Sequence, residues 1–166
     1  MRHFVLFVRL LLAVPLAGRG VLAQAAHPRS DTTAHDTAFA AMQERGKMVM
    51  GVDQYTSTHR FDDLPDGGRI TLVRTTDDAA GATRIQQHLR SIATAFKAGN
   101  FSSPMTVHAT DVPGTKVMAE KNATIVYSVR ALPRGAELTI HTTDPDAVRA
   151  VHEFLAFQRA AHHVSP

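Results

Sequence analysis

Histidine is the residue type in this sequence with the clearest chemical potential. The chain has ten histidines and no cysteine, and nine of the histidines lie beyond residue 25. Imidazole changes charge near neutral pH and is the commonest side-chain metal ligand. Without cysteine there is no disulfide, no thiolate metal site and no thiol nucleophile. The candidate chemistry is therefore metal binding, ligand binding or acid–base catalysis by imidazole.

Three histidines and one methionine are the candidate metal ligands: His59, His88, His108 and Met118. His108 falls in a long connection, with Met105 before it and Met118 after it. Imidazole and thioether groups together suit soft or borderline metals, copper above all. We therefore expect a site for a transition metal such as copper or zinc. Because the four residues lie on different predicted elements, their convergence in space is an assumption.

Each candidate also has a purely structural interpretation. A histidine at the edge of an apolar face, such as His59 or His88, often bonds only to a neighbouring group, and methionine often fills gaps in a core. The remaining histidines of the folded part are expected to be exposed or to lie in a frayed C-terminus: His141, His152, His162 and His163.

No motif completes a catalytic mechanism. The sequence has no nucleophile-elbow glycine pattern and no glycine-rich phosphate loop after a predicted strand. The carboxylates of Asp62 and Asp63 precede a predicted turn and are expected to be solvated. An enzyme with His59 as general base stays open, but no catalytic residue is assigned.

The elements that must position these residues form a weak internal repeat. Leu64-Pro65-Asp66-Gly67 matches Leu132-Pro133-Arg134-Gly135 at an offset of 68 positions. Around each match the pattern indicates a strand, a turn, a second strand and a helix. The strands are expected at 48–61, 69–74, 125–131 and 137–141. The helix that follows the first of these matches has an apolar stripe at spacings of 4, 3 and 4: Ile85, Leu89, Ile92 and Phe96.

This pattern predicts the α+β class. We expect an antiparallel sheet of about four strands, with two long helices on one face and two pseudo-duplicated ββα units at 48–98 and 122–161. The connection 99–121 is expected to contain a short strand at 105–109. A short helix at 37–45 is expected before the first unit, ended by Gly46.

The N-terminal residues 1–25 are typical of a secretory signal peptide, with a basic start, an apolar run and small residues before a cleavage point. A membrane anchor is the alternative, although the apolar run is short and contains Arg9. We expect a flexible tether at 26–35, a single domain at 36–163, no membrane span after cleavage, and a periplasmic or secreted location.

The charge of the chain does not indicate nucleic-acid binding. It has 18 basic and 15 acidic residues, and three of the basic residues but none of the acidic ones lie within residues 1–25. The remainder is therefore formally neutral with histidine neutral. No basic run or basic patch with interleaved aromatics is present, so no nucleic-acid partner is expected.

The sequence resembles a family of small exported bacterial proteins of uncharacterised function. The shared landmarks lie within about residues 48–163, and they are Met50-Gly51-Val52-Asp53-Gln54, Thr58-His59, His88-Leu89, Val112-Pro113-Gly114 and Phe154-Leu155-Ala156-Phe157-Gln158. No activity is established for that family, so the resemblance implies no catalytic residues.

A second similarity is superficial. Ser57-Thr58-His59-Arg60 is similar to the Ser-Thr-Arg-Thr phosphate loop of the aspartate and ornithine carbamoyltransferases. His59 stands in place of the arginine and Arg60 in place of the second threonine. Those chains are also about twice as long and fold as two α/β domains, so a transferase assignment has little physical support.

The leading functional hypothesis is thus an exported, histidine-rich protein that binds a ligand, with a transition metal as the expected ligand. The alternative is a module of the cell envelope that binds a small molecule or a protein partner without metal. The sequence does not determine the oligomeric state, and an enzyme is the less favoured class.

Overall fold

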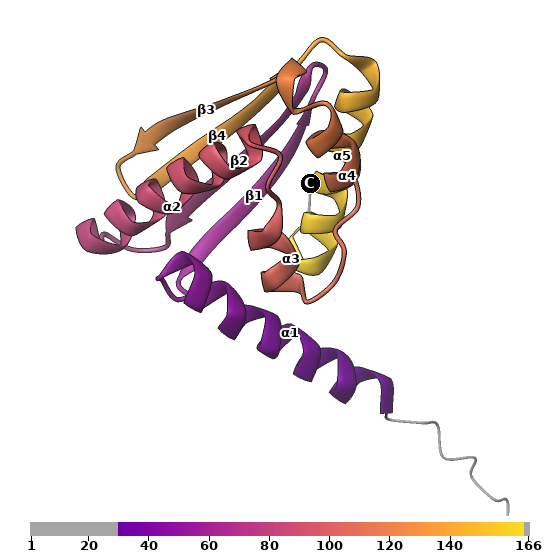
Figure 1. The fold of residues 1–166 in the computed structure, drawn as a ribbon. Coiled ribbons are helices and arrows are strands. Elements are labelled where there is room, and N and C mark those ends of the chain that lie inside the picture. Colours follow the sequence, from indigo (N-terminus) through magenta and orange to yellow (C-terminus); the bar gives the residue numbers. More distant parts are fainter. Residues whose placement is uncertain (1–29, 165–166) are drawn as a thin grey trace, which may run out of the picture.

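The computed structural model describes residues 30–164, with side chains from residue 36 onward, and contains a four-stranded antiparallel sheet in the order β1-β2-β4-β3 (Figure 1). This confirms the α+β class and the four antiparallel strands. The elements in chain order are α1 (Ser30–Met50), β1 (Ser57–Leu64), β2 (Gly67–Arg74), α2 (Ala79–Lys97), α3 (Ser102–His108), α4 (Thr115–Glu120), the 3₁₀ helix η1 (Asn122–Thr124), β3 (Ile125–Leu132), β4 (Gly135–Thr142) and α5 (Pro145–Ala161).

Two hairpins, closed by turns at 65–66 and 133–134, make up the sheet. Their second strands, β2 and β4, pair in the centre with Ile70 opposite Leu138. β2 begins at Gly67, whose φ of 139° strongly favours glycine. A Cβ at this position would also collide with the carbonyl of Ile140 on β4. The predicted Pro-x-Gly turns therefore end where the central pairing needs a residue without a side chain.

The long helices α2 and α5 begin at aspartate caps. Asp78 accepts a hydrogen bond from the Gly81 backbone N–H at 2.9 Å, and Asp144 accepts one from Ala147 at 3.0 Å. α2 packs mainly against β3 and β4, and α5 against β1 and β2. The stripe predicted for the first of these helices is buried as expected: Ile85, Leu89, Ile92 and Phe96.

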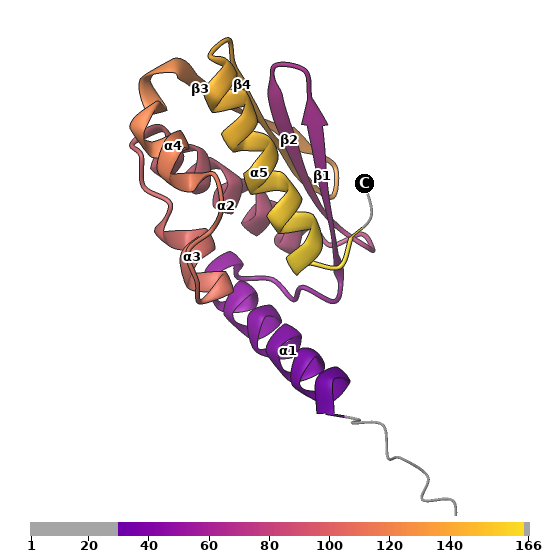
Figure 2. The ribbon, with the colours of Figure 1, turned by 90° about the vertical axis from the view of Figure 1, so that its right-hand side faces the viewer.

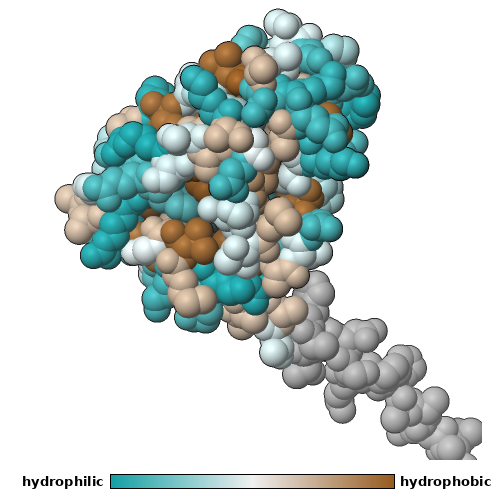
Figure 3. All heavy atoms as spheres, viewed as in Figure 1, coloured by the Kyte–Doolittle hydropathy of each residue, from teal (hydrophilic) through white to brown (hydrophobic). Residues whose placement is uncertain are grey.

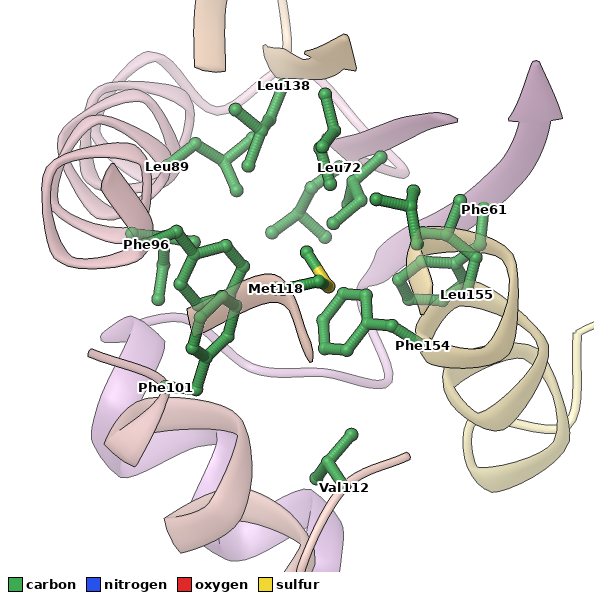
Figure 4. Packing of buried hydrophobic residues seen from close by; sticks show 14 of the residues in the cluster. Phe61, Leu72, Leu89, Phe96, Phe101, Val112, Met118, Leu138, Phe154 and Leu155 are labelled. Carbon is green, nitrogen blue, oxygen red and sulfur yellow. The ribbon is translucent and has the colours of Figure 1, made fainter. Parts of the chain in front are cut away.

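The core lies where inward strand residues meet these helices. Leu138 and Ile140 of β4, Ile85 of α2 and Val151 of α5 are fully buried and belong to one hydrophobic cluster. Met118 of α4 is fully buried in the same cluster, beside the rings of aromatic residues (Figure 4). Removing apolar surface from contact with water stabilises a fold by about 25 cal/mol for each Å² that is buried.

The N-terminal helix α1 is longer than the helix that was predicted at 37–45. It does not end at Gly46 but continues to Met50. The glycine at residue 46 is explained by packing, because a Cβ there would lie 2.9 Å from the Gln54 side chain. Gly46 is thus a close-contact glycine inside a helix and not a stop signal. Figures 1 and 2 both show the N-terminal half of α1 extending away from the sheet.

The N-terminal predictions are tested only in part. Residues 30–35 of the expected tether belong to α1. Residues 26–29 and the predicted signal peptide at 1–25 lie outside the described residues. In the part of the chain that is described, no helix has the length and apolar character that a membrane span requires.

The first strand was predicted too early in the chain. Residues 48–50 are helical, and β1 begins only at Ser57. Between them Asp53 makes a tight turn, in which its side chain accepts a hydrogen bond from the Tyr55 backbone N–H at 2.8 Å. This local side-chain bond competes with extended backbone and delays the strand.

The connection 99–121 contains two short helices, and the strand predicted at 105–109 is wrong. α3 occupies that segment instead, and Asn100 accepts a hydrogen bond from the Ser102 backbone N–H at 3.0 Å at its start. A short apolar run does not distinguish strand from helix by periodicity alone.

On the face shown in Figure 3, apolar residues form separate patches among polar ones.

Candidate functional site

A pair of stacked histidines lies where the start of β1 meets the end of α5. The rings of His59 and His162 have their centroids 4.7 Å apart and their planes inclined by 20°. Phe61, two residues along β1 on the same face, lies 5.7 Å from the His162 ring. β1 places its alternate residues inward, and α5 ends with His162 as its C-cap. The two elements together therefore build a face of two imidazoles and one phenyl ring.

A third imidazole, that of His108, joins this pair from the end of α3. Its ring centroid lies 5.3 Å from that of His162, with the planes nearly perpendicular. Its Nε2 is 3.0 Å from the Gln158 side-chain oxygen, one turn before His162 on α5. The side-chain nitrogen of Gln158 is buried and has no hydrogen-bond partner among the described residues. The cluster thus contains a donor group whose burial is not compensated.

These residues line a cavity of about 100 Å³, which we call the histidine pocket. His88 of α2 is the fourth histidine in its lining. Apolar side chains form most of the rest of the wall, and Gln54 and Gln158 are its amides. The lining contains no aspartate or glutamate. The pocket therefore combines a hydrophobic wall with neutral hydrogen-bonding groups.

Burial keeps these imidazoles uncharged at neutral pH. Desolvation, with a smaller contribution from the nearby His88, lowers the pKa of His59 to about 4. Desolvation and the neighbouring histidines lower the pKa of His162 to about 3. Burial also lowers the pKa of His88, and it lowers that of His108 against the opposing effect of the hydrogen bond from His108 to the Gln158 side-chain oxygen. All four can therefore accept or donate a hydrogen bond without carrying charge.

The predicted ligand set converges only in part. His59, His88 and His108 line the same pocket. Met118 is not in that lining and lies in the core, where Phe96 and Phe154 flank it in Figure 4. Zinc ligands lie about 2.0–2.1 Å from a common point. The described residues contain no group of three or more histidines, cysteines or carboxylates in such an arrangement.

Two of the remaining histidines have specific partners. His152 was expected on the surface, but it is half-buried and its Nε2 lies 2.9 Å and 3.0 Å from the carbonyl oxygens of Leu64 and Gly67. It therefore ties α5 to the turn of the first hairpin. His141 is exposed, as expected, with its Nδ1 2.8 Å from an oxygen of Asp66.

His162 is the site residue that the sequence interpretation missed, because it was expected to fray. A signal for it exists in the spacing of α5. Val151, Leu155, Gln158 and His162 follow at intervals of 4, 3 and 4, which is the same spacing as in the buried stripe of α2. The apolar stripe of α5 thus continues into two polar residues, and both of them line the pocket.

No family model matches this sequence, and neither a curated protein nor a solved structure is similar to the chain. The site is therefore interpreted from its own geometry, and the resemblance to an exported bacterial family stays a prediction.

Proposed function

We propose that the protein binds a small, largely apolar molecule in the histidine pocket. The observation that carries this proposal is a cavity of about 100 Å³ lined by core side chains and four imidazoles, without any carboxylate. Ligand sites are typically concave and mostly apolar, with a few polar groups that fix orientation. The uncompensated Gln158 amide and the neutral imidazoles would serve as those polar groups.

The cavity volume limits the buried part of the ligand. A cavity of about 150 Å³ accommodates the six carbons of a benzene ring, so about 100 Å³ accommodates roughly four or five non-hydrogen atoms. A short alkyl chain or a small ring meets this limit. The linear alcohol 1-pentanol is a suitable neutral probe, because it carries five carbons and one group able to hydrogen-bond.

We expect 1-pentanol to shift the ring signals of His59, His108 and His162 in ¹H–¹³C NMR spectra, and Val107→Phe to abolish this response. Val107 is half-buried in the pocket lining, so a larger ring there fills the cavity. Burial of one methylene group contributes about 0.8 kcal/mol. A variant that no longer buries the alkyl chain of 1-pentanol should therefore bind this alcohol roughly a hundredfold more weakly.

The matched control is Val126→Phe, at a position on β3 that is 56% exposed and outside the pocket lining. This variant should bind 1-pentanol like the unaltered protein. Thermal unfolding of both variants establishes that they are folded. If Val107→Phe binds as well as the control, the pocket is not the site of binding.

We propose in addition that the domain consists of two ββα units, at 48–98 and 122–161, with α2 and α5 on one face of the sheet. Support comes from the strand register, since the opposed residues Ile70 and Leu138 lie 68 positions apart, which is the offset of the repeated turns. A second support is that most buried residues of both helices belong to the same hydrophobic cluster.

Under this duplication the histidine pair occupies the place of an aromatic pair. The offset of 68 between strands relates His59 to Tyr127. The caps of α2 and α5 lie 66 positions apart, which relates Phe96 to His162. Phe96 and Tyr127 are themselves in edge-to-face contact, with ring centroids 5.9 Å apart. Each pair joins one unit to the other, because Phe96 of α2 contacts Tyr127 of β3 and His162 at the end of α5 contacts His59 of β1. One of these two equivalent contacts is thus aromatic and the other consists of two imidazoles, as expected if the latter were specialised for binding.

A transition metal such as copper or zinc is the second candidate for this pocket. It is favoured by three imidazoles that burial holds neutral, because histidine must be neutral to bind a metal. The ring nitrogens would have to turn toward a common point. Under this hypothesis Met118 would need to leave the core to contribute, so the imidazoles are the primary ligands.

If the ligand is a metal, equilibrium dialysis at pH 7 should show specific binding of Cu²⁺ or Zn²⁺ that is lost in the triple variant His59→Ala, His88→Ala, His108→Ala. Because burial lowers the pKa of His59 to about 4 and that of His162 to about 3, protons should compete for these ring nitrogens, and metal binding should weaken, only below about pH 5. The control His141→Ala removes only an exposed imidazole. Equal affinity in the triple variant and the control would exclude the metal hypothesis.

We retain export to the periplasm or the exterior as part of the proposed function. It rests on the signal-like pattern of residues 1–25 alone. A pocket that binds a small ligand fits a protein of the cell envelope, where such molecules are encountered before uptake.

A further inference from the structure

A second concavity lies beside the histidine pocket and shares part of its wall. This outer groove, of about 410 Å³, lies between the end of α1, one face of α2 and the start of α3. Its polar lining consists of Arg84, Gln87, His88, Ser91 and Ser103. Four of these residues follow one another on α2 at spacings typical of a single helix face. The groove is therefore a polar surface organised mainly by one helix.

The two concavities are continuous in their lining. His88 and Ser103 line both, and so do the apolar residues Met50 and Ile92. His88 thus stands between a small apolar pocket and a larger polar groove. A ligand with an apolar part of about five atoms and a polar end could occupy both at once.

The charge of the groove indicates the sign of that polar end. Arg84 is exposed, has no ion pair within 4 Å among the described residues, and bonds to the carbonyl oxygen of Gly51 at 3.5 Å. Its charge also helps to lower the pKa of Asp78, which does not line the groove. The groove lining contains no aspartate or glutamate. Guanidinium binds carboxylates strongly because two parallel hydrogen bonds form. The inner pocket holds neutral imidazoles, so a charged group is better placed in the groove.

We propose that the ligand is a short-chain carboxylic acid, with its alkyl chain in the histidine pocket and its carboxylate in the outer groove at Arg84. This inference rests on the proposed function and adds the chemical class of the ligand. Gln87, about one turn along the same face of α2, supplies a further donor for the carboxylate, whereas the Ser91 hydroxyl already donates to the carbonyl oxygen of Gln87 at 3.1 Å.

The test compares pentanoate with 1-pentanol at pH 7.5 by NMR titration of the full mature chain. The two probes have the same five-carbon skeleton and differ in their charged end. Pentanoate should bind roughly three- to tenfold more tightly, the range expected for one partly exposed guanidinium–carboxylate contact. In Arg84→Gln this advantage should disappear, while 1-pentanol binding is unchanged.

The matched control is Arg90→Gln, which removes the same charge from an exposed position of α2 outside the groove lining. It should keep the preference for pentanoate. Equal binding of both probes, or an equal loss in both variants, would overturn the acid ligand and leave the pocket proposal intact. If neither probe shifts the pocket histidines, both proposals fail.

Discussion

Lowering the pH from 7.5 to 5 is expected to reduce the free energy of unfolding by about 4 kcal/mol through His59 and His162 alone. Both have folded-state pKa values, about 4 and about 3, that lie below the ordinary value of 6.5. Below pH 6.5 the unfolded chain therefore binds protons that the folded chain does not. Stability is fully present above pH 6.5 and is lost as the pH falls toward 4.

No neighbouring carboxylate compensates this loss. Of the nearby charges, Asp63 is held by Arg159 at 2.9 Å, and it contributes to neither histidine's pKa shift. Protonating either ring would therefore place a positive charge among like charges and apolar side chains. The titratable and charged groups that surround the pair are Arg45 of α1, Asp63 of β1, His88 of α2, His108 of α3, and Arg159 and His163 near the end of α5.

Urea unfolding at pH 7.5 and pH 5 measures this effect. His59→Gln and His162→Gln should each remove about half of the difference between the two pH values, because glutamine does not titrate. The control is His141→Gln, at an exposed imidazole outside the pocket. A pH dependence that is the same in all three variants would show that the buried pair does not govern acid stability.

The sequence predicted the parts of this fold that local signals encode. The turns at 65–66 and 133–134 and the buried stripe of α2 follow from turn chemistry and helical spacing within a few residues. The three wrong predictions, which are the end of the first helix, the start of the first strand and the strand at 105–109, concern features that local sequence signals do not determine. Gly46 was interpreted as a helix end because its contact with Gln54 is invisible without the fold.

The candidate site could be predicted only in its members and not in its geometry. His59, His88 and His108 were selected by residue type, and their meeting in one pocket depends on how β1, α2 and α3 pack. His162 was missed because its position after the last turn of α5 indicated fraying. Its burial comes from stacking on His59, a contact between residues about one hundred positions apart.

Replacing both histidines of the pair by phenylalanine is expected to stabilise the protein and abolish ligand binding. The double variant His59→Phe, His162→Phe copies to the contact between β1 and α5 the aromatic contact that Phe96 and Tyr127 make between α2 and β3. Phenylalanine avoids the buried hydroxyl of Tyr127, which has no hydrogen-bond partner among the residues that the structure describes. We expect a gain of about 1 to 2 kcal/mol at pH 7.5 from apolar burial and ring contact, and a larger gain at pH 5.

The reciprocal double variant, Phe96→His with Tyr127→His, tests whether the effect belongs to the position or only to the residue type. It should destabilise the protein at pH 7.5 and add a new loss of stability at acid pH, since one imidazole would be buried and the other half-buried. In the variant His59→Phe, His162→Phe, binding of 1-pentanol should be lost, because the histidine pocket then lacks two imidazoles and part of its volume. The proposal implies that the two imidazoles serve ligand binding at a cost in stability. If the variant His59→Phe, His162→Phe is less stable than the unaltered protein, there is no such cost, and the histidine pair has a structural role.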